Sequence, residues 1–249
     1  MSTLKFSRFI TIGLMAFLAS CSQNLVSPPP PSPPDPSLLA VSSQDELWWI
    51  SLSQDRQDVK VGPIRTASGQ RILGVFDLAW DGKSSSAWAL GDSGGSLYKV
   101  QVASGVATRV GSTGAVLNGL ALDAQGRLFG IGGSGVYELN PLTGAASAIP
   151  GVSLPCDSSG DAAFGDALYA SVSCGSLSGD SLVKVDLASK QAILVGTIGF
   201  EGVYGLSFKD GVLYGATSAG GLLRIDTSTG AGTRIRFLPF GVYGTQGLH

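Results

Sequence analysis

The sequence has little histidine and little charge. His249 is the single histidine among 249 residues, and 14% of the residues are charged. A serine triad and a histidine-rich zinc site both need a positioned imidazole, so we expect neither of them. Glycine-rich segments occur at 92–95 and 132–135, but they join expected strands to strands, whereas a phosphate cradle needs a following helix. The sequence therefore predicts no metal, no cofactor and no catalytic set.

A basic excess is also absent. The formal net charge is −2, and removal of the first 20 residues, which contain Lys5 and Arg8, leaves 14 basic and 18 acidic residues. Recognition of a nucleic acid requires a basic face. We therefore expect no nucleic acid among the partners.

The N-terminal apolar run is short. It covers Phe9–Ala19, eleven residues, which is too few to cross a bilayer. It follows Lys5 and Arg8, and this order is typical of a signal peptide. Leu18-Ala19-Ser20-Cys21 ends the run and resembles the bacterial lipobox, in which a cysteine after a small-residue cleavage site is lipidated. We interpret residues 1–20 as a lipoprotein signal peptide; an ordinary signal peptide with an incidental cysteine is the alternative.

The lipobox resemblance implies a diacylglyceryl thioether and an N-acyl chain on Cys21, and several acyl chains hold a protein on a membrane far more firmly than one. It implies a location outside the cytoplasm, in the bacterial cell envelope. Ser22 stands where an aspartate would signal inner-membrane retention, which favours the outer membrane in bacteria with two membranes. We interpret residues 21–36 as a tether. The proline-rich segment Ser27–Ser37 favours polyproline II and would hold the following domain about 30 Å from the lipid surface; a ligand for proline-recognition domains is the alternative.

Beyond the tether, the chain repeats itself. The 36 glycines fall singly between short apolar runs, as in strands joined by tight turns. A strand with a charged centre recurs as Leu97-Tyr98-Lys99-Val100, Val136-Tyr137-Glu138-Leu139, Leu182-Val183-Lys184-Val185 and Leu222-Leu223-Arg224-Ile225. An aromatic strand and a small-residue strand precede each copy, and a turn and a further short strand follow it. Four antiparallel strands in about 40 to 45 residues are typical of one propeller blade.

The two ends of residues 37–249 complement each other. The N-terminal end contains segments that match the second, third and fourth strands of a blade: Leu38–Ala40, Leu47–Ile50 and Asp58–Val61. The missing first strand is matched at the C-terminal end by Gln246–His249. The sequence therefore predicts an all-β fold, a five-bladed β-propeller closed by pairing of a C-terminal strand with the N-terminal blade. A linear solenoid is the alternative. The repeat resembles bacterial NHL and WD-repeat-like propellers, which implies the architecture and no function.

Cys156 and Cys174 flank the first hairpin of the third expected blade. Pairing outward from a turn at Gly165-Asp166 sets Asp157 opposite Cys174, so Cys156 lies one residue from direct register. Because export permits oxidation, we predict a structural disulfide between the two cysteines. A redox or metal-binding pair is the alternative, although no histidine or third sulfur is near in the sequence.

Trp48 and Trp49 are neighbours in an expected strand, so their side chains must point to opposite faces of the sheet. One of them should pack between blades. The other either packs in the same way or is exposed, where it is available to hold a carbohydrate or a protein.

The candidate ligand site lies where the first strands of the blades begin. Alignment of the repeats superposes Phe76, Asn118, Gly160, Tyr204 and Gln246, with Asp77 and Asp161 in the next column and Asp92, Asp157 and Glu201 in neighbouring loops. If these strands line the axis, the residues form a polar and aromatic mouth at its entrance, typical of a small-ligand site. The alternative is that they satisfy strand ends and one another across a water-filled channel.

Two functions remain open. The first is a binding or scaffolding module that holds an unknown envelope protein or glycan at this mouth. Its ligand-binding candidates are Phe76, Asp77, Asn118, Asp161, Tyr204 and Gln246. A purely structural role in envelope assembly is not separable from it. The second is a glycoside-directed hydrolase, because five-bladed propellers resemble the arabinanase type, with Asp77, Asp161 and Glu201 as its carboxylates. Two carboxylates about 5 to 10 Å apart across a cleft would support the second function.

Overall fold

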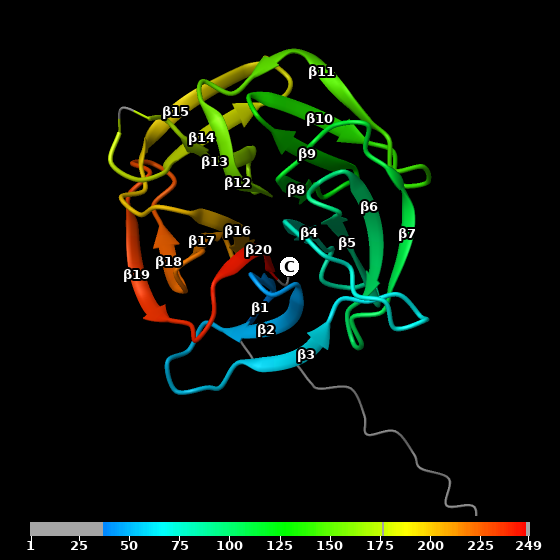
Figure 1. Cartoon of the computed structure of the whole chain (residues 1–249). Coiled ribbons are helices and arrows are strands. Elements are labelled where there is room, and N and C mark those ends of the chain that lie inside the picture. Colours follow the sequence, from blue (N-terminus) through cyan, green and yellow to red (C-terminus); the bar gives the residue numbers. More distant parts are fainter. Residues whose placement is uncertain (1–36, 176, 248–249) are drawn as a thin grey trace, which may run out of the picture.

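The computed structural model is a ring of antiparallel sheets around one axis (Figure 1). It describes residues 37–175 and 177–247, which form twenty strands in five four-stranded sheets. The lipobox with Cys21, the signal peptide and the proline-rich tether lie outside these residues, so their interpretation stays a prediction. Within the described ranges, no helix is both long and apolar enough to span a membrane.

Each blade is numbered here by the order of its inner strand in the chain, and its strands follow from the axis outward. Blade 1 comprises β4 (Asp77–Ala79), β5 (Ser86–Gly91), β6 (Ser96–Gln101) and β7 (Ala107–Ser112). Blade 2 comprises β8 (Gly119–Leu122), β9 (Leu128–Gly132), β10 (Gly135–Leu139) and β11 (Ala146–Ser153). Blade 3 comprises β12 (Asp157–Phe164), β13 (Leu168–Ser173), β14 (Ser181–Asp186) and β15 (Gln191–Thr197). Blade 4 comprises β16 (Val203–Lys209), β17 (Val212–Thr217), β18 (Gly221–Ile225) and β19 (Gly232–Phe237). Blade 5 comprises β20 (Val242–Gly247), β1 (Ser37–Ser42), β2 (Glu46–Ser51) and β3 (Val59–Pro63).

The last strand of the chain closes the ring. β20 pairs antiparallel with β1, with Leu39 opposite Gln246 and Val41 opposite Gly244. Figure 1 shows β20 beside β1 at the centre of the ring. The five-bladed propeller closed by its two ends is therefore confirmed, and the linear solenoid is excluded. The sequence predicts the closing strand at residues 244–249; β20 begins two residues earlier, at Val242, and residues 248–249 lie outside the described part of the chain.

Blades stack because both faces of a sheet are apolar. In β18, Leu222 and Leu223 point to opposite faces, while Arg224 is exposed. Leu222 packs in a cluster with Leu38 of blade 5, and Leu223 packs in another cluster with Tyr169 of blade 3. A single sheet cannot cover two such faces, whereas neighbouring blades in a ring cover both.

The paired tryptophans both pack at seams between blades. The ring of Trp49, with 3% of its surface exposed, lies edge-on to Trp80 of blade 1 at 5.4 Å. Trp48 is half-buried, and its ring lies 4.3 Å from that of Phe240, which follows blade 4. The expectation of one packed tryptophan is confirmed, and the second has a packing role too.

An ion pair and side-chain hydrogen bonds join blades 4 and 5 at their outer strands. The Arg236 guanidinium forms an ion pair with Asp58 and also donates to the Ser51 carbonyl at 2.7 Å. The Gln54 amide donates to the Ile235 carbonyl at 2.9 Å. These contacts hold the N-terminal blade against its neighbour, so closure does not depend on β20 alone.

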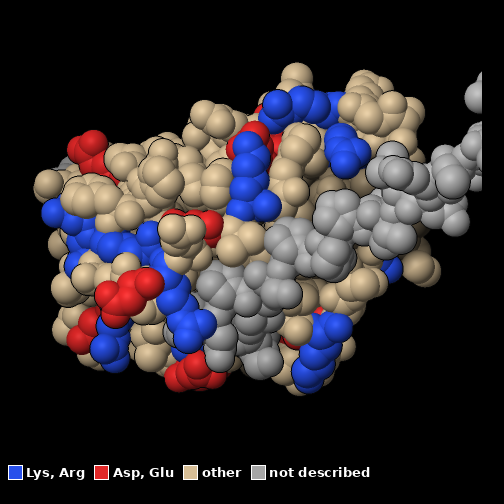
Figure 2. All heavy atoms as spheres, turned by 90° about the horizontal axis from the view of Figure 1, so that it is seen from below, with Lys and Arg blue, Asp and Glu red and all other residues tan. Residues whose placement is uncertain are grey.

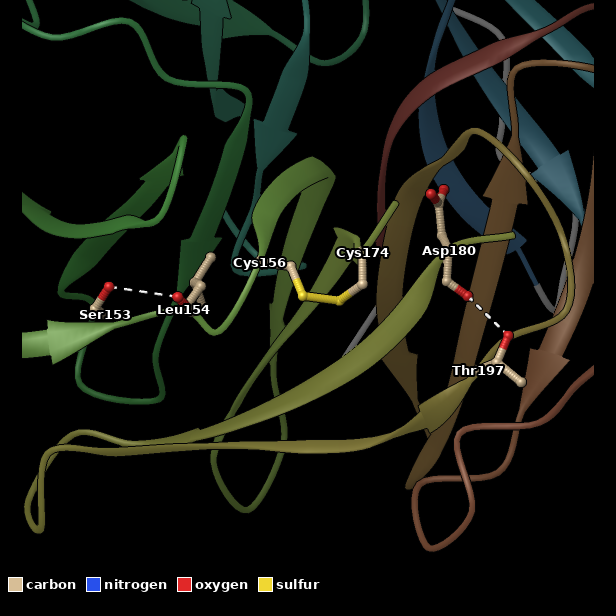
Figure 3. The surroundings of a disulfide bond; sticks show 6 residues. All are labelled: Ser153, Leu154, Cys156, Cys174, Asp180 and Thr197. Carbon is tan, nitrogen blue, oxygen red and sulfur yellow. Dashed lines mark hydrogen bonds between the residues drawn. A yellow bond between two sulfur atoms is a disulfide. The ribbon is translucent and has the colours of Figure 1, made fainter. Parts of the chain in front are cut away.

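The predicted disulfide is present. Cys156 and Cys174 are bonded, with their Cα atoms 5.2 Å apart (Figure 3). The predicted register is wrong by one residue: Asp157 lies opposite Ser173, because a bulge between Ser158 and Ala162 shifts the pairing of β12 with β13. The bulge brings the two cysteines into direct register. No group of three or more potential metal ligands exists among the described residues.

Candidate functional site

A small pocket opens where the innermost strands begin. Its volume is about 240 Å³, and its lining comes from blades 1 to 5: Phe76, Asn118, Ser159, Gly160, Tyr204 and Tyr243. Phe76 directly precedes β4 and Asn118 directly precedes β8. The other four residues lie within the first four residues of β12, β16 and β20. The predicted mouth of the ring is thus a real hollow. It is smaller than the roughly 300 to 1,000 Å³ of typical drug-sized sites.

Three aromatic rings form much of the pocket wall. Phe76, Tyr204 and Tyr243 are each half-buried, and the rings of Tyr204 and Tyr243 meet edge to face at 5.7 Å. Gly160 permits this packing, since a Cβ there would lie 2.7 Å from the Tyr204 Cα. Any side chain at position 160 would therefore displace the wall and fill part of the hollow.

The amide of Asn118 is held in one orientation. Its Nδ2 donates to the Ser158 carbonyl at 3.0 Å, and its Oδ1 accepts from the Ser158 hydroxyl at 2.8 Å. These two bonds cross the seam from blade 2 to blade 3. The side chain is therefore a rigid part of the wall.

A carboxylate lies behind the serine of the pocket. The Ser159 hydroxyl donates to Oδ2 of Asp180 at 2.7 Å, and the Val203 backbone N–H donates to the same oxygen at 2.7 Å. Burial raises the pKa of Asp180, while these hydrogen bonds lower it and the nearby Glu201 charge raises it. Asp180, which is labelled in Figure 3, directly precedes β14, and its bond from Val203 reaches the start of β16, so it joins blades 3 and 4.

Two buried carboxyl groups meet on the axis, one residue deeper than the pocket. Asp77 and Asp161 are fully buried and hydrogen-bonded to each other. Asp77 also accepts from the N–H of Leu120, and Asp161 accepts from those of Leu206 and Thr245, at 2.5, 2.5 and 3.3 Å. These five residues belong to the five innermost strands, so the pair ties all blades together.

The pair retains protons. Burial, and then the Asp161 carboxylate, raises the pKa of Asp77 well above its ordinary value. Burial raises the pKa of Asp161 to about 7, although the hydrogen bonds from Asp77 and from backbone N–H groups lower it. Two carboxylates in contact cannot both ionise without strong repulsion. The pair therefore shares a proton at neutral pH.

The structure separates the six ligand-binding candidates into two groups. Phe76, Asn118 and Tyr204 line the pocket. Asp77, Asp161 and Gln246 are buried and do not line it; Gln246 lies opposite Leu39 in the closing sheet. Among the loop residues, Asp157 and Glu201 are exposed, and Asp92 accepts a hydrogen bond from the Tyr98 hydroxyl at 2.8 Å.

Sequence reasoning missed Tyr243. The resemblance of Gln246-Gly247-Leu248 to Asn118-Gly119-Leu120 placed the wrong residue at the mouth, because pairing with β1 places the start of β20 at Val242. The usable signal is a tetrapeptide: Gly-Val-Tyr-Gly occurs at 202–205 and again at 241–244. That repeat aligns Tyr243 with Tyr204, as the structure does.

The carboxylates of the hydrolase hypothesis do not assemble. Asp77 and Asp161 are in direct contact and buried, whereas glycosidases keep two carboxyl groups about 5 to 10 Å apart across a cleft. Glu201 is exposed and lies near Asp180 instead. The geometry therefore lacks the acid and base arrangement that this reaction needs.

A wider hollow of about 1420 Å³ opens on the opposite face, where the inner hairpins turn. Four of the charged groups in its lining form two ion pairs: Arg127 with Asp123 at 2.7 Å and Lys184 with Asp166 at 2.5 Å. Because these groups satisfy each other, the hollow presents fewer free polar groups than its size suggests.

Comparison with known proteins shows the fold and no family. No family model matches the chain, and no curated protein matches it. A chain from a nidogen/laminin complex structure is similar over 84% of this chain and 97% of that one, with 11% identity and a TM-score of 0.58. A Bacteroides thetaiotaomicron protein of unknown function is similar over 81% of this chain, which spans 55% of that protein, with 18% identity and a TM-score of 0.55. At these identities the neighbours show that the chain shares the propeller fold, and nothing beyond the fold.

Proposed function

We propose that this chain is an exported, lipid-anchored binding module of the bacterial cell envelope, whose glycan or protein partner inserts one group into the mouth pocket. The observation that carries the proposal is the pocket itself: three half-buried rings and an oriented amide converge on about 240 Å³. Aromatic walls with a few placed polar groups are typical of ligand sites. A rigid ring holds them, which keeps the ordering cost of binding low.

The residues at the mouth vary among the blades, although the scaffold repeats and blades 4 and 5 both contribute a tyrosine. Phe76, Asn118, Gly160, Tyr204 and Tyr243 occupy the pocket, and they range from no side chain to a large phenol. The packing strands instead keep apolar residues of similar size in every blade. Such variation supports an asymmetric ligand, because each wall residue then makes a different contact and is selected separately.

The test of the site compares Tyr204→Ala and Asn118→Ala with wild type. The control is Tyr214→Ala, because Tyr214 is also half-buried but does not line the pocket. A glycan array and a pull-down from envelope extracts measure binding, with all variants at matched thermal stability. We expect both mouth variants to weaken binding at least tenfold and the control to retain it. Equal binding by wild type and mouth variants would place the site elsewhere.

The lipid anchor is tested separately through Cys21. The Cys21→Ser variant should partition into the aqueous phase of a detergent extraction, since the acyl chains require the thiol. Metabolic labelling with palmitate should label wild type alone. If the variant stays in the detergent phase as fully as wild type, the anchor is not on this cysteine.

A further inference from the structure

The pocket wall is rich in aromatic rings and contains no cationic side chain. Three of its six lining residues are aromatic, and none is lysine or arginine. The face of an aromatic ring carries partial negative charge, which attracts a cation held over it. The wall thus favours a positively charged group over an anion.

Two polar side chains of the wall, Asn118 and Ser159, are already engaged in hydrogen bonds. Both functional atoms of Asn118 bond to Ser158, and the Ser159 hydroxyl donates its proton to Asp180. A sugar ring needs several donors and acceptors for its hydroxyl groups, and among the side chains of the wall these bonds leave mainly the hydroxyls of Tyr204 and Tyr243 to provide them. An alkylated ammonium group needs none, because ring faces and nearby negative charge suffice for it.

Carboxylates outnumber cations around the mouth. The loops on this side contain Asp45, Asp92, Asp180 and Glu201, and Asp157 begins β12; the cationic residues in the same described loops are Arg65 and Arg71. Arg71 donates to the Gln44 carbonyl at the edge of the ring. The outer wall differs, because there Lys and Arg side chains lie next to Asp and Glu side chains (Figure 2). The mouth therefore has a negative field that focuses cations.

We propose that the mouth pocket binds an organic cation, a compact alkylammonium group of the trimethylammonium type, between the rings of Phe76, Tyr204 and Tyr243. The assignment rests on the proposed function, because it names the ligand class of the same pocket. The Asp180 carboxylate behind Ser159 and the carboxylates of the surrounding loops supply the negative charge. The volume of about 240 Å³ admits the head of a ligand and leaves its tail outside. Both a free small molecule and a phosphocholine headgroup carry this chemistry.

The experiment uses isothermal titration of the full chain in a detergent that contains no choline. The probes are tetramethylammonium, choline, phosphocholine and the uncharged isostere of choline, 3,3-dimethylbutan-1-ol. We expect both free cations to bind and the isostere to bind at least tenfold more weakly, because it matches the shape and lacks the charge. Tighter binding of phosphocholine than of choline would assign the source as a headgroup, and the reverse order would assign a free cation.

Variants separate ring faces from hydroxyl groups. Tyr204→Ala and Tyr243→Ala should each lower choline affinity at least fivefold, whereas Tyr204→Phe should retain it because the ring remains. Asp180→Asn should weaken choline but leave the isostere unchanged. The Tyr214→Ala control should bind as wild type does.

Three outcomes overturn the assignment. Equal affinities for choline and its isostere would show that the pocket does not select charge, and the proposed function would survive. Choline binding that persists in Tyr204→Ala and Tyr243→Ala would place the cation elsewhere. No binding of any cation would exclude the ligand class, and the array and pull-down comparison of Tyr204→Ala would then decide the proposed function independently.

Discussion

Raising the pH from 5 to 8 should destabilise the ring, because the folded protein holds protons that the unfolded chain releases. Asp77 and Asp161 meet on the axis, and burial raises the pKa of both. A group with a raised folded pKa contributes stability that is fully present below its unfolded pKa and is lost as the pH rises through its folded pKa. For Asp161 this window runs from 3.8 to about 7, and for Asp77 it also begins near the ordinary value and extends upward.

The magnitude follows from the proton that the carboxyl pair retains. For each proton that the folded state retains and the unfolded chain releases, the free energy of unfolding falls by about 1.4 kcal/mol for each unit by which the pH rises. Across the whole Asp161 window this amounts to roughly 4 kcal/mol, an upper bound and a large share of the typical 5–15 kcal/mol. The carboxylates with lowered pKa values, such as Asp166 and Asp226, titrate below pH 4 and do not contribute between pH 5 and 8.

The assay is urea denaturation of wild type, Asp77→Asn and Asp180→Asn at pH 5, 6, 7 and 8. Wild type should lose stability steadily over this range. Asp77→Asn should be less stable at pH 5, because Nδ2 cannot accept a backbone N–H, and should show a smaller slope with pH. Burial also raises the pKa of Asp180, so Asp180→Asn measures its share of the slope. A wild-type midpoint that is constant from pH 5 to 8, or an unchanged slope in Asp77→Asn, would refute the shared-proton pair.

Three further predictions concern the ring itself. Cys156→Ser should lower the free energy of unfolding by about 3 kcal/mol, because the disulfide closes a loop with a sequence separation of 18. Reduction of the wild-type disulfide should reproduce this loss in the same denaturation assay, and no shift on reduction would contradict the prediction. Gly244→Ala should cost about 1–3 kcal/mol, since a Cβ would lie 2.3 Å from an Asp77 oxygen, whereas Gly175→Ala, which meets no atom within 4 Å, should leave the melting temperature unchanged. Deletion of β20 should unfold the whole ring because it exposes an inner edge of β1 and removes a donor to Asp161, and a cooperative transition at the wild-type temperature would show that closure is dispensable.

Local pattern was enough to predict the architecture. The recurrence of the strand Leu222–Ile225 and its equivalents indicated the blades, since alternation of buried and exposed residues along a strand is a local property. Complementary ends indicated the closure and the number of blades. The pairing of Cys156 with Cys174 followed from one hairpin, although its bulge was not predictable from residue types.

The site depended on tertiary structure, and the match of Gln246 to Asn118 misplaced one of its residues. The pairing of β20 with β1 decides which residue of the last strand faces the pocket, and these two strands lie at opposite ends of the chain. Alignment of the repeats therefore indicated Gln246, whereas Tyr243 lines the pocket in the structure. The meeting of Asp161 with Asp77 and with the Thr245 N–H likewise depends on ring closure, which brings residues 84 positions apart to one axis. The sequence by itself determined the blades, their order and the disulfide, because these arise from neighbours along the chain. The pocket, its negative surroundings and the proton held on the axis were decided only by the tertiary structure, because they exist only where five separate strands converge.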